Sequence, residues 1–222
     1  MLTQVFAIKS VEEMKMCVDA GLDRWGLEVG EKGIMPSEMN YEKTRAVFAA
    51  TPSNYPKMAL TIETDMRTLV EIVTETRPDL LHLCGEIDQF KPDAVAQLRE
   101  QIPGVQIIQA IPVAGPEAID IAHAYEDVSD TLFLDSNDAS VTGIGIAGVT
   151  HDWNISRAIV EAVATPCILA GGLTPENVAE AVRAVRPWGV DSNTHTCVPG
   201  TWNKDIDRMR RFSQQAKNAL QE

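Results

Sequence analysis

The feature that most constrains this chain is a regular alternation of strand-like and helix-like segments from one end to the other. Short apolar runs typical of buried strands occupy residues 2–8, 24–29, 58–62, 80–83, 105–111, 130–135, 166–170 and 188–192. Helical segments follow at residues 10–20, 41–50, 65–76, 93–101, 117–125, 154–164, from 174 onward and 206–220. Because a helix after each strand lets the next strand run parallel to it, this order predicts a parallel sheet.

Eight such units fit one closed domain. With 222 residues the unit is about 28 residues long, near the lower end for an eight-stranded barrel, and 45% hydrophobic residues suffice for a core. We therefore predict a single α/β domain over residues 1–222, a (β/α)8 TIM barrel, with a doubly wound open sheet as the alternative. In such barrels the active site lies at the carboxyl ends of the strands.

Charge and cysteine usage exclude several classes of function. The formal net charge is −13, whereas binding to a nucleic-acid backbone needs a basic face. No apolar run approaches the roughly 20 residues that span a bilayer, and the first residues lack the basic region of a secretion signal. The four cysteines include no C-x-x-C pair, which is typical of reduced thiols. We expect a cytoplasmic protein that binds neither nucleic acid nor membrane.

One glycine-rich segment gives a misleading match. Gly143, Gly145 and Gly148 form a G-x-G-x-x-G pattern, but they follow the sixth strand after a gap and no helix begins at once. The pattern therefore does not predict dinucleotide binding. We interpret Gly145 as part of a loop over a ligand, with an ordinary solvent-exposed loop as the alternative.

The segment at residues 168–177 (ILAGGLTPEN) is more informative. Gly171 and Gly172 end a strand and let a ligand approach the backbone closely. Thr174 followed by proline indicates a helix start, which directs free N–H groups toward the glycines. In barrels the loops after strands seven and eight are a frequent phosphate site. A tight turn that merely needs glycine is the alternative.

Several segments match a known pattern, densely from about residue 130 onward and sparsely before it. They are Leu134-Asp135, residues 169–178 (LAGGLTPENV) and 185–191 (VRPWGVD), then 83–86 (LCGE), 150–153 (THDW), Pro199-Gly200 and Lys204-Asp205. These segments resemble the phosphoribosylanthranilate isomerases, barrel enzymes of tryptophan synthesis. The resemblance implies an Amadori rearrangement, which converts an aminoaldose phosphate into an aminoketose phosphate.

The resemblance also implies a cysteine general base at the end of strand one and an aspartate general acid at the end of strand six. Asp135 matches the aspartate, but Phe6 stands where the cysteine is expected. The arginine expected after strand two is missing, since residues 33–40 (GIMPSEMN) contain none. In the eighth unit the family's S-S-G is replaced by Asn193-Thr194-His195. Because Phe6 cannot accept a proton, we expect the protein to be a poor phosphoribosylanthranilate isomerase.

Other polar residues fall where a replacement base is needed. Glu28 ends strand two, and His82 and Cys84 share one face of strand four. Glu28, His82, Asp135 and His195 therefore make an unusual polar set near the barrel mouth. Each also has an ordinary interpretation: a solvent-facing strand end for Glu28, a hydrogen-bonded core side chain for His82, a loop residue for His195 and a purely structural carboxylate for Asp135. Cys84 is likewise open to interpretation as a small core side chain.

The combined prediction is an Amadori-type aldose–ketose isomerase for a small phosphorylated sugar derivative, whose identity the sequence leaves open. Asp135 is the expected acid, and Glu28 or His82 the base. The expected phosphate-binding residues are Gly171, Gly172, Asn193, Thr194, His195 and Gly145. We expect no cofactor and a monomer or homodimer.

Two other classes remain open. In a metal-assisted epimerase or aldolase, Glu28, His82, Asp135 and His195 would bind a divalent metal through nitrogen and carboxylate oxygen. In a catalytically inactive barrel, the same rim would bind a metabolite without turning it over.

Overall fold

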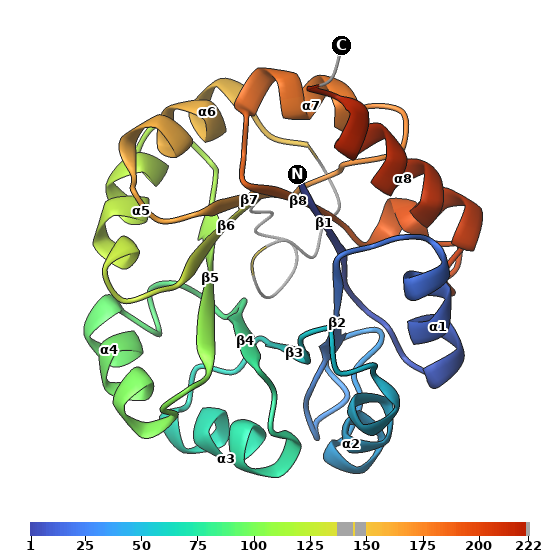
Figure 1. The fold of residues 1–222 in the computed structure, drawn as a ribbon. Coiled ribbons are helices and arrows are strands. Elements are labelled where there is room, and N and C mark those ends of the chain that lie inside the picture. Colours follow the sequence, from blue (N-terminus) through green and yellow to red (C-terminus); the bar gives the residue numbers. More distant parts are fainter. Residues whose placement is uncertain (137–143, 145–149, 221–222) are drawn as a thin grey trace.

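Eight parallel strands close into a barrel that helices surround (Figure 1). The computed structural model describes residues 1–136, 144 and 150–220. Each strand pairs with the next along the sequence, and β1 closes the ring against β8. The predicted (β/α)8 barrel is confirmed, and the open sheet is wrong.

The strands are β1 (Leu2–Val5), β2 (Arg24–Glu28), β3 (Met58–Thr61), β4 (Leu80–Leu83), β5 (Gln106–Pro112), β6 (Thr131–Asp135), β7 (Cys167–Leu169) and β8 (Gly189–Ser192). The helices are α1 (Val11–Asp19), α2 (Tyr41–Ala50), α3 (Met66–Thr76), α4 (Pro92–Gln101), α5 (Ala118–Glu126), α6 (Trp153–Ala162), α7 (Val178–Val185), the 3-10 turn η1 (Thr194–Thr196) and α8 (Ile206–Asn218). Within the described residues, no helix combines the length and apolar character needed to cross a membrane.

Two predicted boundaries differ from the structure for local reasons. The strand expected over residues 2–8 ends at Val5, because Ala7 adopts a left-handed backbone with φ 61° that breaks the extended conformation. The helix expected from Thr174 becomes regular only at Val178. The Thr174 hydroxyl instead accepts the N–H groups of Glu176 and Asn177, at 3.1 and 3.2 Å, and so caps a turn that leads into α7.

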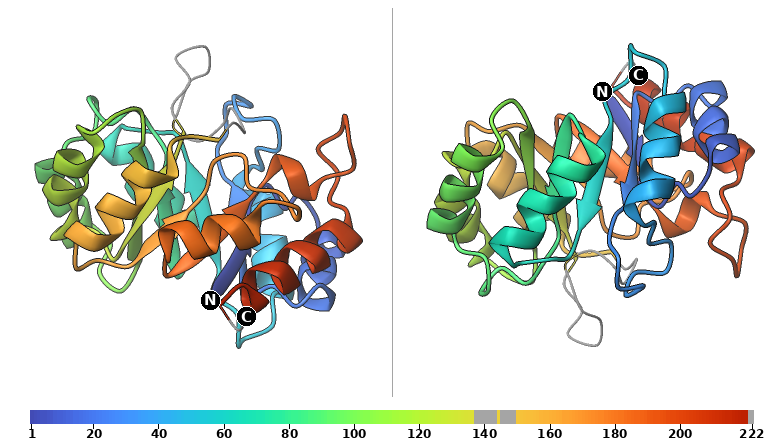
Figure 2. Two further views of the ribbon diagram at one scale, coloured as in Figure 1. Left: turned by 90° about the horizontal axis from the view of Figure 1, so that it is seen from above. Right: turned by 90° about the horizontal axis from the view of Figure 1, so that it is seen from below.

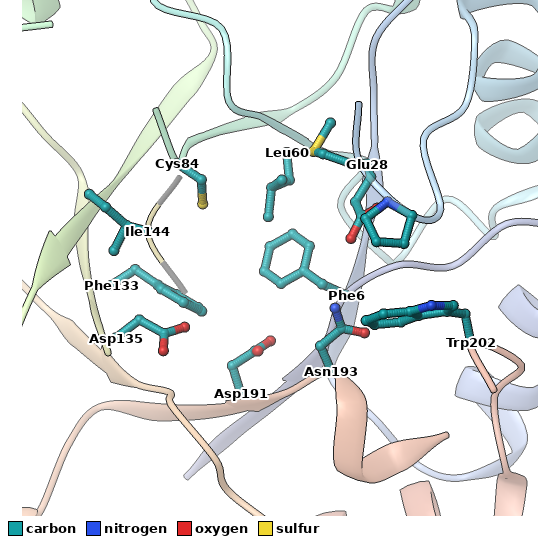
Figure 3. Close-up of a pocket in the computed structure, with 12 residues that line it drawn as sticks. Phe6, Glu28, Leu60, Cys84, Phe133, Asp135, Ile144, Asp191, Asn193 and Trp202 are labelled. Carbon is teal, nitrogen blue, oxygen red and sulfur yellow. The ribbon is translucent and has the colours of Figure 1, made fainter. Parts of the chain in front are cut away.

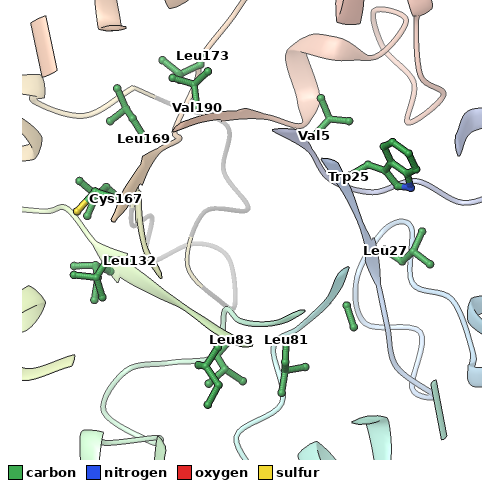
Figure 4. Packing of buried hydrophobic residues seen from close by; sticks show 14 of the residues in the cluster. Val5, Trp25, Leu27, Leu81, Leu83, Leu132, Cys167, Leu169, Leu173 and Val190 are labelled. Atoms are coloured by element: carbon green, nitrogen blue, oxygen red, sulfur yellow. The ribbon is translucent and has the colours of Figure 1, made fainter. Parts of the chain in front are cut away.

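Alternation along the strands produces two separate cores. Outward-facing side chains pack between the strands and the helices, and Figure 4 shows this ring, which includes Val5, Trp25, Leu27, Leu81, Leu132, Leu169 and Val190. Inward-facing side chains fill the barrel and include Phe6, Met58, Leu60, Leu80, Ile108, Phe133 and Ile168. The amino terminus lies at the amino ends of the strands, opposite the loop between β2 and α2 (Figure 2). Because the interior is packed, a ligand can approach only at the ends of the strands.

Phe6 dominates the upper part of this interior. Its ring centroid lies 4.9 Å from that of His82 and 6.0 Å from that of Phe133. The ring fits only because residue 26 on the neighbouring strand is glycine: a Cβ atom there would lie 2.1 Å from Cε1 of Phe6. Glycine in a strand commonly marks such a close approach.

We therefore predict that Gly26→Ala destabilises the protein by about 1–3 kcal/mol, since the added methyl group overpacks the core against Phe6. The free energy of unfolding, measured by urea titration, is the test. The penalty should shrink when Phe6 is already replaced by leucine, with Phe6→Leu alone as the reference. An equal penalty in both backgrounds would show that Phe6 is not the obstacle.

Candidate active site

Two adjoining pockets open at the carboxyl ends of the strands. The central pocket is lined by Phe6, Glu28, Met35, Pro36, Leu60, Cys84, Phe133, Asp135, Ile144, Asp191, Asn193 and Trp202 (Figure 3). The glycine pocket is lined by Asp135, Gly171, Gly172, Leu173, Asp191, Ser192, Asn193, Thr194 and His195. Because Asp135, Asp191 and Asn193 line both, one ligand can extend from the first pocket into the second.

Three buried carboxyl groups point into the central pocket, from β2, β6 and β8 (Figure 3). Glu28 ends β2, and its Oε2 accepts the backbone N–H of Ser37 at 2.9 Å. Burial raises the pKa of Glu28, and this hydrogen bond offsets only part of that rise. Glu28 therefore lies in the central pocket, at the end of its strand.

Asp135 ends β6 and is the carboxyl group with the clearest acid–base character. Burial raises the pKa of Asp135 to about 7. The N–H of Ser136 donates to its Oδ1 at 2.7 Å and the Ser136 hydroxyl lies 3.3 Å from the same atom, and both contacts lower the pKa against that rise. A group with this pKa can hold or release a proton near neutral pH.

Asp191, in β8, is a site residue that the sequence reasoning did not single out. Its Oδ1 is buried and has no hydrogen-bond partner among the described residues. Burial first, and repulsion from Asp135 second, raise the pKa of Asp191 well above its ordinary value. A signal was present in the sequence, because Asp191 lies two residues before Asn193 at the end of a strand.

His82 does not join these carboxyl groups. Its side chain is fully buried, lines neither pocket, and packs against the rings of Phe6 and Phe133, with the latter centroid at 4.3 Å. Its Nε2 lies 3.2 Å from Sγ of Cys84. Burial lowers the pKa of His82 to about 3, so the ring is neutral and a weak base. Cys84 does line the central pocket, but burial raises its thiol pKa well above the ordinary value.

The glycine pocket has the backbone geometry that the sequence indicates. Gly171 and Gly172 have φ values of 79° and 60°, which place them in the left-handed region. The Ser192 hydroxyl donates to the carbonyl of Leu173 at 2.7 Å and so ties β8 to the loop after β7. Gly145, the remaining predicted ligand-binding residue, lies outside the described residues.

Asn193, Thr194 and His195 lie in and just before the turn η1 and line this pocket. They share it with the two glycines, so the loops after strands seven and eight border one pocket. Among the described residues, however, no group of three or more His, Cys, Asp or Glu side chains is arranged to hold a metal. Glu28, His82, Asp135 and His195 therefore do not form the ligand set that the metal-assisted alternative requires.

Comparison with known proteins identifies the family. A family model described as N-(5'phosphoribosyl)anthranilate (PRA) isomerase matches residues 4–215. N-(5'-phosphoribosyl)anthranilate isomerase 2 of Methanosarcina mazei is 34% identical over 218 residues, which cover 98% of this chain and 95% of that protein.

Solved structures of phosphoribosylanthranilate isomerases are similar in fold to this chain. The isomerase from Pyrococcus furiosus has a TM-score of 0.79 at 22% identity, covering 98% of this chain and 99% of that chain. A phosphoribosyl anthranilate isomerase in complex with reduced 1-(o-carboxyphenylamino)-1-deoxyribulose 5-phosphate also has a TM-score of 0.79, at 20% identity and 98% coverage of both chains. The similarity over nearly the whole sequence shows that this chain belongs to the N-(5'-phosphoribosyl)anthranilate isomerase family of isomerases.

Proposed function

We propose that this protein isomerises a phosphorylated aminoaldose to the corresponding aminoketose by an Amadori rearrangement, with Asp135 as the general acid. The observation that carries the proposal is the position of Asp135. Its carboxyl group lines both pockets and burial raises its pKa to about 7, so it can protonate a substrate oxygen near neutral pH. Membership of an isomerase family supports the same reaction class.

Glu28 is the base that we propose for the proton on carbon. The rearrangement removes a proton from the carbon next to the aldimine carbon of the substrate. The protein therefore has to supply a base within reach of the central pocket. Phe6, which follows β1, offers no acceptor, but β2 pairs with β1 and ends at Glu28. His82 is the other predicted base, but its low pKa and its absence from the lining of both pockets favour Glu28.

Asp191 completes the proposed proton chemistry by sharing a proton with Asp135. Two carboxyl groups that repel one another in a buried site ionise one at a time, and the apparent pKa values belong to the pair. With one proton on the pair, Asp135 can remain an acid while Glu28 acts as the base. No step of this scheme needs a cofactor.

The glycine pocket is the proposed phosphate site. Backbone N–H groups near Gly171 and Gly172, with Asn193 and Thr194 opposite them, offer donors without a lysine or arginine cluster, which suits an acidic protein. His195 lies at the edge of the same pocket. The remaining part of the substrate would then extend past Asp135 and Asp191 into the central pocket. The expected partner is thus a small phosphorylated molecule, bound by a monomer or homodimer.

The first prediction from this scheme concerns Asp135→Asn, which keeps the shape of the side chain and removes its proton. We expect kcat to fall at least about a hundredfold on the phosphorylated aminoaldose that the wild type converts fastest, in line with the loss of a general acid. In the wild type, kcat should fall as pH rises through about 7, because the acid form of Asp135 is lost there.

Asp130→Asn is the matched control, because Asp130 precedes the same strand at its opposite end and pairs with Arg99 at 2.7 Å. It should lower stability and leave turnover near the wild-type level. If the Asp135→Asn variant turned over substrate near the wild-type rate, the acid role would be disproved. If neither the wild type nor this variant showed any turnover, an inactive metabolite-binding barrel would be favoured.

A second prediction concerns the phosphate site. Gly172→Asp should abolish binding of inorganic phosphate, measured by isothermal titration calorimetry, because it adds a negative charge and a side chain at a left-handed position. Gly104→Asp is the control, since Gly104 also has a left-handed backbone, φ 88°, but lies between α4 and β5, and no atom of the described residues comes within 4 Å of its Cβ position. Unchanged phosphate affinity in Gly172→Asp would contradict the site.

A third prediction concerns the reaction for which the family is named. With Phe6 in place of a base, the gene should support at most slow growth of a tryptophan auxotroph that lacks its own phosphoribosylanthranilate isomerase. The M. mazei relative is the positive control. Robust growth at ordinary expression levels would mean that Glu28 or another group replaces the cysteine fully.

A further inference from the structure

An arginine is buried inside the barrel, near the amino end of a strand, and no step of the proposed reaction uses it. Arg24 is the first residue of β2 and is 5% exposed. Its guanidinium carbon lies 5.4 Å from the ring centroid of Trp188, and its Nε donates to Oε1 of Gln4 at 2.5 Å. Burial lowers the pKa of Arg24 to about 10, so the group still carries a positive charge into the interior at neutral pH.

Gln4 connects this arginine to the carboxyl group of Asp191. The register of the closed barrel places Gln4 beside Arg24 on β2 and beside Asp191 on β8. Because arginine has donors and no acceptor, the amide oxygen of Gln4 has to face Arg24, which leaves the amide N–H groups for other partners. Nε2 of Gln4 and Oδ1 of Asp191 are both buried, and neither has another hydrogen-bond partner among the described residues. The side chain of Gln4 lowers the pKa of Asp191 as a hydrogen-bond donor.

The positive charge of Arg24 needs a nearby anion. None of the ion pairs formed among the described residues includes Arg24. Of the carboxylates that raise the pKa of Arg24, Asp191 has the larger effect and Asp23 the smaller, and Asp23 already pairs with Lys217 at 3.0 Å. A buried cation without a compensating anion is strongly unfavourable. An ionised Asp191 therefore stabilises the interior of the barrel.

Asp135 and Asp191 point into the same pocket and share one proton in the proposed scheme (Figure 3). Burial, and then repulsion from Asp135, raise the pKa of Asp191. Gln4, Lys204 and Arg24 lower the same pKa against that rise. These three side chains favour the ionised form of Asp191, so they bear on which carboxyl group of the pair holds the proton.

The surroundings of Asp135 are compatible with a proton on that group. The contacts that lower its pKa come from the N–H and the hydroxyl of Ser136, and both use Oδ1. A neutral carboxyl group can keep both contacts on one oxygen while the other oxygen carries the proton. An attraction to a cation, in contrast, is lost when a carboxylate is neutralised. The cations near Asp191 thus distinguish the two aspartates more than Ser136 does.

We propose that Arg24 and Gln4 are positioning residues that hold the negative charge of the pair on Asp191 and so leave the shared proton on Asp135. This inference rests on the proposed function and deepens it, because Asp135 is the proposed general acid. Neither Arg24 nor Gln4 lines a pocket, so both act through Asp191 and not on the substrate. The other titratable and charged groups around the pair and Arg24, which the tests below leave unchanged, are Glu28, His82, Cys84 and Lys204.

Gln4→Glu tests this connection with little change of shape. The new carboxylate would pair directly with Arg24, which keeps the buried cation compensated, and it would repel a charge on Asp191. We expect the shared proton to move toward Asp191, so kcat on the phosphorylated aminoaldose should fall about tenfold or more. The alkaline limb of the kcat–pH profile should move to higher pH, because the pair loses its last proton less readily beside an added negative charge.

Arg24→Met removes the cation and should change kcat and the pH profile in the same directions, since the doubly ionised pair is then less stable. Arg24→Lys keeps the charge and should keep the alkaline limb near its wild-type position. Trp188→Leu is the matched control, because it removes the aromatic contact of Arg24 and leaves the charge. It should lower stability without moving the limb. Wild-type profiles in both Gln4→Glu and folded Arg24→Met would overturn the proposal.

The position of the proton can also be measured without substrate. Carbon-13 NMR of aspartate-labelled protein, with resonances assigned through Asp135→Asn and Asp191→Asn, should show a neutral Asp135 and an ionised Asp191 between the two titration steps of the pair. In Gln4→Glu the neutral form should shift toward Asp191. A neutral Asp191 beside an ionised Asp135 in the wild type would overturn this inference. Undiminished turnover by Asp135→Asn would overturn the proposed function instead, whichever group the NMR titration shows to be neutral.

Discussion

The pairing of β1 with β8, which closes the barrel, decides which side chains can meet at the site. In this register Gln4 lies beside Asp191 and Val5 beside Ser192. On its other side β1 pairs with β2, the strand that ends at Glu28. The end of β1 therefore lies between two strands that each carry a buried carboxyl group to the same rim. Phe6 therefore leaves the end of β1 without a proton acceptor, whereas the neighbouring strands β2 and β8 still carry the carboxyl groups of Glu28 and Asp191.

Burial, rather than ion pairing, controls the ionisation of these groups. None of the ion pairs formed among the described residues involves Glu28, Asp135 or Asp191. Desolvation is the largest cause of the raised pKa of each, and repulsion between the two aspartates adds to it for Asp191. A surface carboxylate would be ionised throughout the neutral range and could not act as an acid. Burial thus gives ordinary side chains the proton affinities that acid–base chemistry requires.

The fold and part of the candidate site could be predicted from the sequence alone, because both depend on local sequence patterns. Alternation of segments predicts the barrel, and strand ends predict the rim positions of Glu28 and Asp135. The depth of a side chain inside the barrel depends instead on partners from distant strands. His82 faces inward as its spacing indicates, yet Phe6 and Phe133 pack against it and it lines neither pocket. Asp191 was missed because its nearness to Asp135 appears only when the barrel closes.

Phe6 determines the shape of the site as well as its chemistry. Its ring occupies the space that the missing side chain of Gly26 leaves, and it packs against His82. The floor of the central pocket is therefore aromatic carbon, and the imidazole lies below it. The carboxyl groups of this pocket come instead from its walls, which are β2, β6 and β8. Phe6 and Phe133 line the same pocket as Asp135, whose pKa is raised by burial. The residue that stands where the base is expected therefore also contributes apolar surface to the pocket of the proposed acid.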